Sequence, residues 1–562
     1  MELNSNDRQP QSSLWKRLQR FAMPRVSRIW LLALAVLTIG GMLRFWHLGT
    51  AVYWGDEVYS SLRIFGHTTA QLHSTIAQTP LISHDALQAF QQIRPTEGLN
   101  RTLESLAIED AHIAPLYFVL ARIWGSIFGD SVTAMRSLAA LFGVLLIPAS
   151  YYLAMDLFNL PQDDRPELNR RTAHAIASWM MILVASSPLH FLMAREARGY
   201  SLWMLTTVLS SIFLLRALKR SHWDRWVLFA IALMLNFYSN FLALITFFGY
   251  LVYVTIIYWR DRATLRQFGV ASSLSLLGFF PWLSVFLTRA MVDNRDAEGV
   301  IGHASLQLAV RNWFELLRRL WIDFDTNPGT SKFWAIGLGL VVIASCGLII
   351  QGSRQIHQAH GFRVGLFLTL LILPLPLCFF DRSLQGLLPS RYLLPSYIGL
   401  QLIAAYALGQ PQRQPHQRTI GLVATAMIIS VGLFSCQQSA IASNWWNKYF
   451  SNCNTQAAAI VNATPQPLII SDGTGGKHFD HALSNLLSLN RLVKAETQFQ
   501  VSLETSLDSP PIAPQFPHRF LFAPSNAFRD RLAAAYPGKL HPLLNHQNPY
   551  RGETVCLWRL DP

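Results

Sequence analysis

The run IWLLALAVLTIGGMLRFW, residues 29–46, is followed a few residues later by YWGDEVY, residues 53–59. An apolar run of this length is close to the roughly 20 residues that a helix needs to cross a bilayer. Asp56 and Glu57 then place two adjacent carboxylates at the membrane surface, where ionisable groups are costly unless they are solvated or used. This placement leaves two interpretations open: a polar loop start that anchors the span, or a carboxylate that accepts a proton from a substrate hydroxyl.

The composition is that of a polytopic helical membrane protein. Of the 562 residues, 51% are hydrophobic and only 14% are charged, whereas a soluble protein has about 25% charged residues. Ten further apolar runs lie near residues 132–156, 172–190, 199–217, 226–240, 241–259, 267–287, 333–351, 364–380, 392–409 and 419–436. The net charge of +14 does not point to nucleic acid, because lysine and arginine gather beside membrane spans and near anionic lipids.

The segment 112–128 decides the topology. It is apolar but carries Pro115 near its start and Arg122 in its middle, and an arginine at mid-bilayer is costly. If this segment does not cross, the arginine-rich linkers all fall on the side of the basic tail 1–28, as the positive-inside rule requires. We therefore predict a cytoplasmic tail, eleven spans and a helix at 112–128 lying in the outer interface of the plasma (inner) membrane.

Three regions follow from this topology. The transmembrane domain covers 29–436, and its first outer loop, 47–131, is too long for a plain connector. Short amphipathic helices are expected within 68–92, which suits a loop lying on the membrane. After the last span, 437–562 alternates short apolar runs with helical stretches, so we predict a small α/β domain. It follows an odd number of spans and is expected to be extracytoplasmic, with Asp56.

The cysteines suggest one disulfide. Cys453 and Cys556 are the two cysteines of the 437–562 region, and the other three lie in or beside predicted spans. Cysteines in an oxidising compartment often pair, so a bond between Cys453 and Cys556 is a hypothesis that spacing in sequence does not prove.

The outer loops are rich in arginine, which indicates an anionic ligand. Pairing with nearby carboxylates or with lipid headgroups is the alternative that the sequence leaves open. The chain contains no CxxC, no HExxH and no Walker A loop, so no motif for a nucleotide or a metal stands out. The conspicuous outer-loop arginines are Arg136, Arg195, Arg198 and Arg391.

Several of these motifs together resemble the glycosyltransferase C-type membrane superfamily. The resemblance is to the family 39-like branch, which contains the protein O-mannosyltransferases and the lipid A aminoarabinose transferases. The order and spacing of the motifs carry it, and the matching stretches are Asp56-Glu57, 112–117, 129–136, 187–200 and 391–395. The chain departs from the family at the turn between the fifth and sixth spans. Family members often have a histidine there, where this chain has Tyr238-Ser239-Asn240.

The resemblance implies an inverting hexosyl- or pentosyltransferase. The donor would be a sugar on a polyprenyl phosphate, and the acceptor a hydroxyl of a lipid, glycan or protein at the outer face. Asp56 would be the general base, and Glu57 would orient it or bind the acceptor. The expected ligands of the donor phosphate are Arg136, Arg198, Arg391, Tyr392 and His112, and the expected substrate-binding residues are Arg195, Glu196, Tyr200 and Asn240. For His112, a helix-capping role is the alternative. No cofactor is implied with certainty, and the participation of a divalent cation is left undecided.

Two other function classes are compatible with a polytopic chain. One is a transporter or flippase of a glycolipid, and the other is a non-catalytic protein of cell-envelope assembly. Transporters place ionisable residues near the membrane midplane, whereas the charges here gather at one face. A scaffold should tolerate truncation of Asp56, and a transferase should not.

Overall fold

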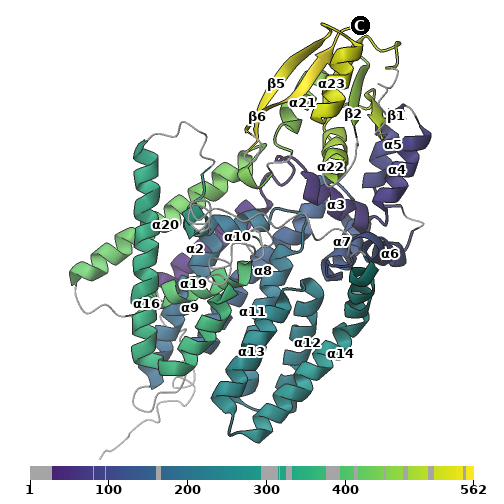
Figure 1. The fold of residues 1–562 in the computed structure, drawn as a ribbon. Helices are drawn as coiled ribbons and strands as arrows, with labels where there is room; N and C mark the ends of the chain where they lie inside the picture. The colour runs from purple at the N-terminus through teal and green to yellow at the C-terminus, as the bar shows by residue number, and fades with distance from the viewer. Residues whose placement is uncertain are drawn as a thin grey trace, which may run out of the picture.

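The computed structural model describes most of the chain, and the structural statements below concern these residues. The described residues are 28–79, 81–94, 97–159, 166–292, 314–315, 317–324, 332–374, 391, 393–410, 415–448, 451–472, 479–503, 512–548 and 552–562. Figure 1 shows a bundle of long helices with a smaller sheet-containing region above one end.

Over the described residues, the predicted apolar runs fall on helices of the bundle, because an apolar segment in lipid satisfies its backbone polar groups internally by forming a helix. Residues 375–380 of the run 364–380 lie outside the described residues. The long helices are α2 (Arg28–Phe45), α8 (Val132–Phe158), α9 (Pro166–Ser186), α11 (Tyr200–Lys219), α12 (Trp223–Ser239), α13 (Ala243–Tyr258), α14 (Arg262–Val292), α16 (Lys332–Ile372), α19 (Leu394–Gly409) and α20 (Pro415–Ile441). Helix α8 packs against α9 and α11, and α16 packs against α19.

Helix α16 joins two runs that the sequence separates by a linker. The predicted linker near 352–363 is helical in the structure, and the interruption is confined to Gly361, whose φ is +60°. Glycine adopts this conformation without the clash that a Cβ would cause. The change of direction therefore takes one residue rather than a loop.

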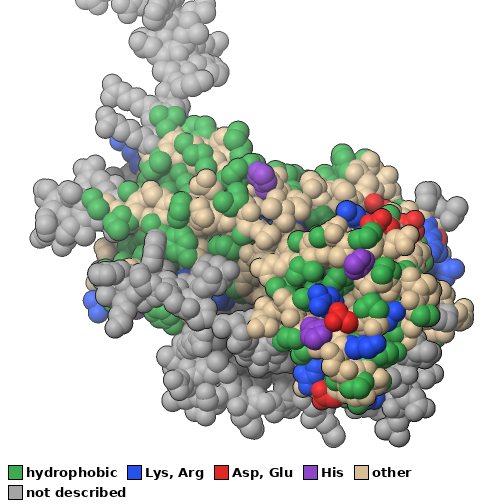
Figure 2. Space-filling view, turned by 90° about the horizontal axis from the view of Figure 1, so that it is seen from above, with side chains coloured by type: hydrophobic (Ala, Val, Ile, Leu, Met, Phe, Trp, Pro, Cys, Tyr) green, Lys and Arg blue, Asp and Glu red, His purple; other side chains and the backbone are tan. Residues whose placement is uncertain are grey.

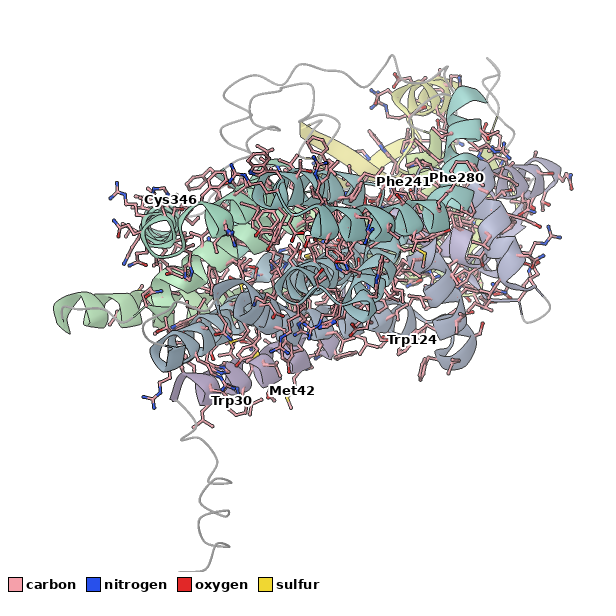
Figure 3. The ribbon with its side chains drawn as sticks, turned by 90° about the horizontal axis from the view of Figure 1, so that it is seen from below. Trp30, Met42, Trp124, Phe241, Phe280 and Cys346 are labelled. Carbon is pink, nitrogen blue, oxygen red and sulfur yellow. A yellow bond between two sulfur atoms is a disulfide. The ribbon has the colours of Figure 1, made fainter. Side chains whose placement is uncertain are left out.

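The chain is a multi-pass membrane protein by the length and apolarity of its helices. Five segments of the described chain are long and apolar enough to cross a bilayer: Val132–Phe158, Tyr200–Lys219, Arg262–Arg289, Gly339–Ile372 and Thr425–Lys448. The count of eleven spans stays a prediction. Large apolar side chains cover the outside of the bundle, as Trp30 and Met42 illustrate at its edge in Figure 3. Trp30 and Met42 are exposed, as expected for side chains that face lipid.

Helix α7 (Leu116–Phe128) is the ambiguous segment of the sequence. Its 13 residues make about 20 Å of helix, which is short of the ~30 Å hydrocarbon core. Arg122 is buried, and its Nη2 donates to the backbone carbonyls of Arg94 and Glu97 in the first loop. The arginine is therefore held by the first loop through Nη2 and does not face lipid.

The first outer loop contains helices before it reaches α7. They are α3 (Gly55–Ile64), α4 (Thr69–Gln78), α5 (His84–Gln88) and α6 (Leu99–Glu109). Arg63 of α3 pairs with Glu109 at 2.5 Å and with Asp110 at 2.6 Å, and this binds α3 to the end of α6. The loop is thus a packed structure that holds α3 in place.

The region after α20 is an α/β unit around one sheet. Its elements are η4 (Trp446–Lys448), α21 (Asn454–Asn462), β2 (Pro467–Asp472), α22 (Phe479–Asn490), β3 (Gln498–Ser502), β4 (His518–Phe522), α23 (Asn526–Ala535), β5 (Leu540–Asn548) and β6 (Gly552–Leu560). The strand order is β1-β3-β2-β4-β6-β5. Strand β2 is parallel to β3 and β4, whereas β6 is antiparallel to β4 and β5.

The first loop contributes the edge strand of this sheet. Strand β1 (Ile82–Ser83) pairs antiparallel with β3, with Ile82 opposite Phe499. The loop and the C-terminal region therefore lie on the same side of the bundle, as Figure 1 also shows. Seen from above, the acidic side chains of this face gather on the half that these two regions form (Figure 2).

The disulfide hypothesis is confirmed. Cys453, just before α21, is bonded to Cys556 of β6, and their Cα atoms are 6.7 Å apart. The bond closes the α/β unit between its first helix and its last strand.

Candidate active site

Helix α3 carries the two carboxylates in its first turn. The backbone N–H of Gly55 donates to Oγ of Ser451 at 3.2 Å, so the start of α3 is held by the segment between η4 and α21. A Cβ at position 55 would lie 2.8 Å from Oγ of Ser484 in α22, and glycine is what permits this approach. Negative charge at a helix N-terminus is also favoured by the helix dipole, so α3 places Asp56 and Glu57 firmly.

Asp56 lies between two arginines and is partly accessible. Its Oδ2 is 3.0 Å from Nη1 of Arg391, before α19, and 3.2 Å from Nη1 of Arg198, before α11. Arg198 also donates to the backbone carbonyl of Asp56 at 3.1 Å. The side chains of Asp56, Arg198 and Arg391 are 20%, 16% and 24% exposed. The carboxylate is therefore partly exposed to solvent and is flanked by two guanidinium groups.

Glu57 is fully buried and fully bonded. Arg136 donates to both of its oxygens at 2.7 Å, Lys448 Nζ donates to Oε2 at 3.0 Å, and the backbone N–H of Ala197 donates to Oε1 at 2.9 Å. Burial alone would raise the pKa of Glu57, but the charges of Arg136 and Lys448 together with these bonds lower it to about 2. Glu57 is therefore ionised, and from its buried position it holds Arg136, Lys448 and the backbone of Ala197 in place.

Arg136 is engaged by the protein through all five of its N–H groups. Besides its two bonds to Glu57, it donates to the carbonyls of Leu48 and Ala51 at 2.7 and 2.9 Å and to that of Val52 at 2.8 Å. A guanidinium has five such donors. This geometry differs from the expected phosphate-binding role, because Arg136 has no donor left for a phosphate.

Arg195 closes the end of α2 instead of facing a substrate. Its guanidinium donates to the carbonyls of Leu43 and Trp46 at the C-terminus of α2 and to that of His47. A further bond reaches the carbonyl of Ala440 in α20. These orphan carbonyls at a helix end need a partner, and a cation there is favoured by the dipole. These bonds give Arg195 a structural role, and its expected substrate-binding role stays a prediction.

Aromatic rings line the charged cluster. The guanidinium of Arg391 lies 5.7 Å and the ammonium of Lys448 5.9 Å from the ring centre of Trp54, which is buried. Arg198 lies 5.3 Å from the ring of Tyr200. Cations are attracted to the faces of such rings, so Trp54 and Tyr200 hold the site's cations in position.

Two of the expected ligands lie on turns next to helix ends, and a third is not among the described residues. His112 is exposed on the turn between α6 and α7. Asn240 ends α12 and accepts the N–H of Leu242 through its side chain at 2.9 Å. Tyr392 lies outside the described residues. The structure thus brings together Asp56 with Arg198 and Arg391, but does not join His112 to them by an ion pair within the described chain.

Sequence reasoning missed two members of the site. Lys448 bonds Glu57, and its neighbour Asn447 donates from Nδ2 to Oε1 of Glu196. Both lie in the run NWWNK, 444–448, just after the last predicted span. A lysine beside tryptophans at a membrane surface is usually an interface anchor, so the run gave no signal of a site.

The described residues contain no group of three or more His, Cys, Asp or Glu side chains placed to hold a metal ion. Asp56, which lies next to two cationic groups, is a side chain that can accept a proton. An anion that enters beside Asp56 would find two arginines that combine charge with directional N–H donors.

Comparison with known proteins identifies the fold. No protein-family model matches the sequence, and no curated protein matches it significantly. Among solved structures, ArnT of Cupriavidus metallidurans aligns over 94% of this chain and 97% of its own at 12% identity. Its TM-score is 0.52 in the apo state and 0.50 when bound to undecaprenyl phosphate.

The archaeal oligosaccharyltransferase AglB of Archaeoglobus fulgidus aligns at 13% identity over 82% of this chain and 64% of its own, with a TM-score of 0.47. ArnT is a lipid A aminoarabinose transferase of the glycosyltransferase C-type superfamily. The likeness to ArnT therefore confirms, at the level of the fold, the resemblance found in the sequence: the chain has the glycosyltransferase C-type fold.

Proposed function

We propose that the chain is an inverting hexosyl- or pentosyltransferase of the plasma membrane. It transfers a sugar from a polyprenyl-phosphate donor to a hydroxyl of a lipid, glycan or protein acceptor at the extracytoplasmic face. The observation that carries the proposal is the pairing of the partly exposed Asp56 with Arg198 and Arg391. The fold shared with ArnT, which was solved bound to undecaprenyl phosphate, supports the class of donor.

Asp56 acts as the general base. It accepts the proton of the acceptor hydroxyl, and the acceptor oxygen attacks the anomeric carbon from the face opposite the phosphate. The bond from the anomeric carbon to the phosphate oxygen breaks, the phosphate leaves with the electron pair, and the configuration inverts, as in inverting sugar hydrolysis. Arg198 and Arg391 hold the carboxylate of Asp56 in place through their ion pairs with Oδ2.

Arg198 and Arg391 stabilise the departing phosphate. A phosphate that leaves as an anion needs positive charge more than it needs a proton donor, and guanidinium groups supply that charge in a fixed geometry. Arg136 supports the site indirectly, because its bonds to Glu57 hold the first turn of α3. The proposal includes no cofactor. If a chelator stops sugar transfer and added Mg²⁺ or Mn²⁺ restores it, a divalent cation takes part in the reaction.

The decisive experiment is sugar transfer in proteoliposomes that contain the purified chain, polyprenyl-phosphate sugars and candidate acceptors. Asp56→Asn keeps the side-chain volume but cannot take up a proton, so transfer should fall by about 10²–10⁴-fold or more. Asp85→Asn is the matched control, because Asp85 lies in the same loop and its side chain is 86% exposed. Full activity of Asp56→Asn would refute the proposal and favour a transporter or an assembly scaffold.

A further inference from the structure

Glu196 is a buried carboxyl group that the proposed reaction leaves without a task. Its side chain is 1% exposed. Oε1 accepts a hydrogen bond from Asn447, whereas Oε2 has no hydrogen-bond partner among the residues that the structure describes. A buried carboxyl oxygen without a partner is rare in proteins and calls for an explanation, such as an absent ligand.

The turn that carries Glu196 belongs to the active site. The next residue, Ala197, donates its backbone N–H to Glu57, and the one after it, Arg198, pairs with Asp56. Asn447, which holds Oε1, precedes the lysine that bonds Glu57. Glu196 is therefore fixed between the two elements that support the catalytic carboxylates.

Burial favours the neutral form of Glu196. Burial raises its pKa most strongly, and the negative charge of Glu57 raises it further, against the opposing effects of Lys448, Arg391 and Arg198. The titratable and charged groups that interact with Glu196 are Glu57 of α3, Tyr117 of α7, Arg136 of α8, Arg198 of its own turn, Arg391 before α19 and Lys448 of η4.

We propose that Glu196 is a phosphate-binding residue that donates a hydrogen bond from Oε2 to an oxygen of the phosphate bound by Arg198 and Arg391. This rests on the proposed function, because the ligand is the phosphate group of a polyprenol. A neutral acid adds a donor beside the phosphate without adding a negative charge. An ionised carboxylate at the same place would repel the phosphate, since it is an acceptor only.

The test is binding of undecaprenyl phosphate to the full chain in lipid nanodiscs between pH 5 and pH 8. Glutamine has the shape of a protonated glutamic acid and can donate a hydrogen bond, so Glu196→Gln should bind within about threefold of the wild-type chain at low pH. Glu196→Ala should bind about tenfold more weakly or worse, because one hydrogen bond to a charged group is lost. Glu104→Gln, in an exposed part of the first loop, should match the wild type.

The pH profile separates this role from a merely structural one. As pH rises and Glu196 ionises, the wild-type chain should lose affinity relative to Glu196→Gln. The second ionisation of the phosphate acts on all variants alike, so the ratio of their affinities isolates Glu196. The comparison of the wild-type chain with Glu196→Gln tests the role of Glu196 even if Glu196→Ala fails to fold.

Two results would overturn the inference alone: Glu196→Gln binding far more weakly than the wild type at every pH, or a folded Glu196→Ala binding equally well. Failure of the wild-type chain to bind undecaprenyl phosphate at all would instead refute the proposed function, and the inference with it.

Discussion

The ammonium group of Lys448 lies 3.0 Å from Oε2 of Glu57, although 391 residues separate the two in sequence. This contact joins the segment after α20 to the first turn of α3. It gives Glu57 a second cation besides Arg136, inside a cluster where all three side chains are buried. The C-terminal region therefore helps to hold the first turn of α3, which carries Asp56 next to Glu57.

Lys448→Met should lower both stability and transfer. Removing one partner of a buried ion pair typically costs about 3–5 kcal/mol, although the remaining bonds of Glu57 to Arg136 and Ala197 should place the loss at the lower end. Thermal unfolding in detergent and the transfer assay measure the two effects. Lys494→Met is the control, because Lys494 is exposed in the same region. A Lys448→Met chain with wild-type unfolding and activity would show that Glu57 does not need the lysine.

The pH dependence of stability should contain a term from Glu57. Its pKa is about 2 in the folded protein against an ordinary value of 4.5, so the unfolded chain binds the proton more readily. The stabilisation is then fully present above about pH 4.5 and is lost as pH falls toward 2. It is worth about 3 kcal/mol.

Comparison of the wild-type chain with Glu57→Gln measures this term. The difference in free energy of unfolding should be constant between pH 5 and 7 and should shrink below pH 4. A difference that does not change with pH down to 3 would contradict the ionised, cation-bound state of Glu57.

The helices of the bundle could be predicted because a bilayer demands long uncharged runs, and those runs are visible in the sequence. The kink at Gly361 could not be predicted, since the arginines on either side of it suggest a loop. The pairing of Ile82 with Phe499 could not be predicted from the sequence either. A two-residue strand has no periodicity, and its partner is distant in sequence.

Contacts between candidate residues could be anticipated where those residues sit in short motifs. Asp56, Arg198 and Arg391 were expected to act together, and the structure brings them into contact. Arg136 and Arg195 look the same in sequence but bind Glu57 and backbone carbonyls. A sequence shows that a guanidinium is present, and only the fold shows which acceptors meet it.

Arg391→Lys should reduce transfer although the charge is kept. Lysine cannot present two parallel N–H donors to a phosphate and stacks less well on an aromatic ring, and Arg391 contacts both Asp56 and the ring of Trp54. We expect kcat/KM to fall by about 10–100-fold, equivalent to one charged hydrogen bond. Arg101→Lys, at an exposed position of the first loop, should have no effect. Equal activity of Arg391→Lys would show that a point charge suffices.

Loss of the disulfide should weaken the C-terminal region and disturb the site. Cys453 lies two residues after Ser451, which holds the N–H of Gly55. Cys453→Ser or Cys556→Ser should lower the free energy of unfolding by about 2–4 kcal/mol and reduce transfer further at raised temperature. Cys346→Ser, which removes a free cysteine, is the matched control. If all three variants unfold alike, the bond contributes no stability.

Helix α7 should not cross the membrane, and the sheet itself supplies the reason. Because β1 of the first loop pairs with β3 of the C-terminal region, the chain must cross an even number of times between them. The ten other predicted spans in that interval satisfy this, and an additional crossing by α7 (Leu116–Phe128) would not. Reporter fusions after Phe128 and after Pro562 should therefore both give an extracytoplasmic signal. A cytoplasmic signal at Phe128 would make α7 a span, and one at Pro562 would place the sheet and the proposed active site on the wrong face for a lipid-linked donor of the outer leaflet.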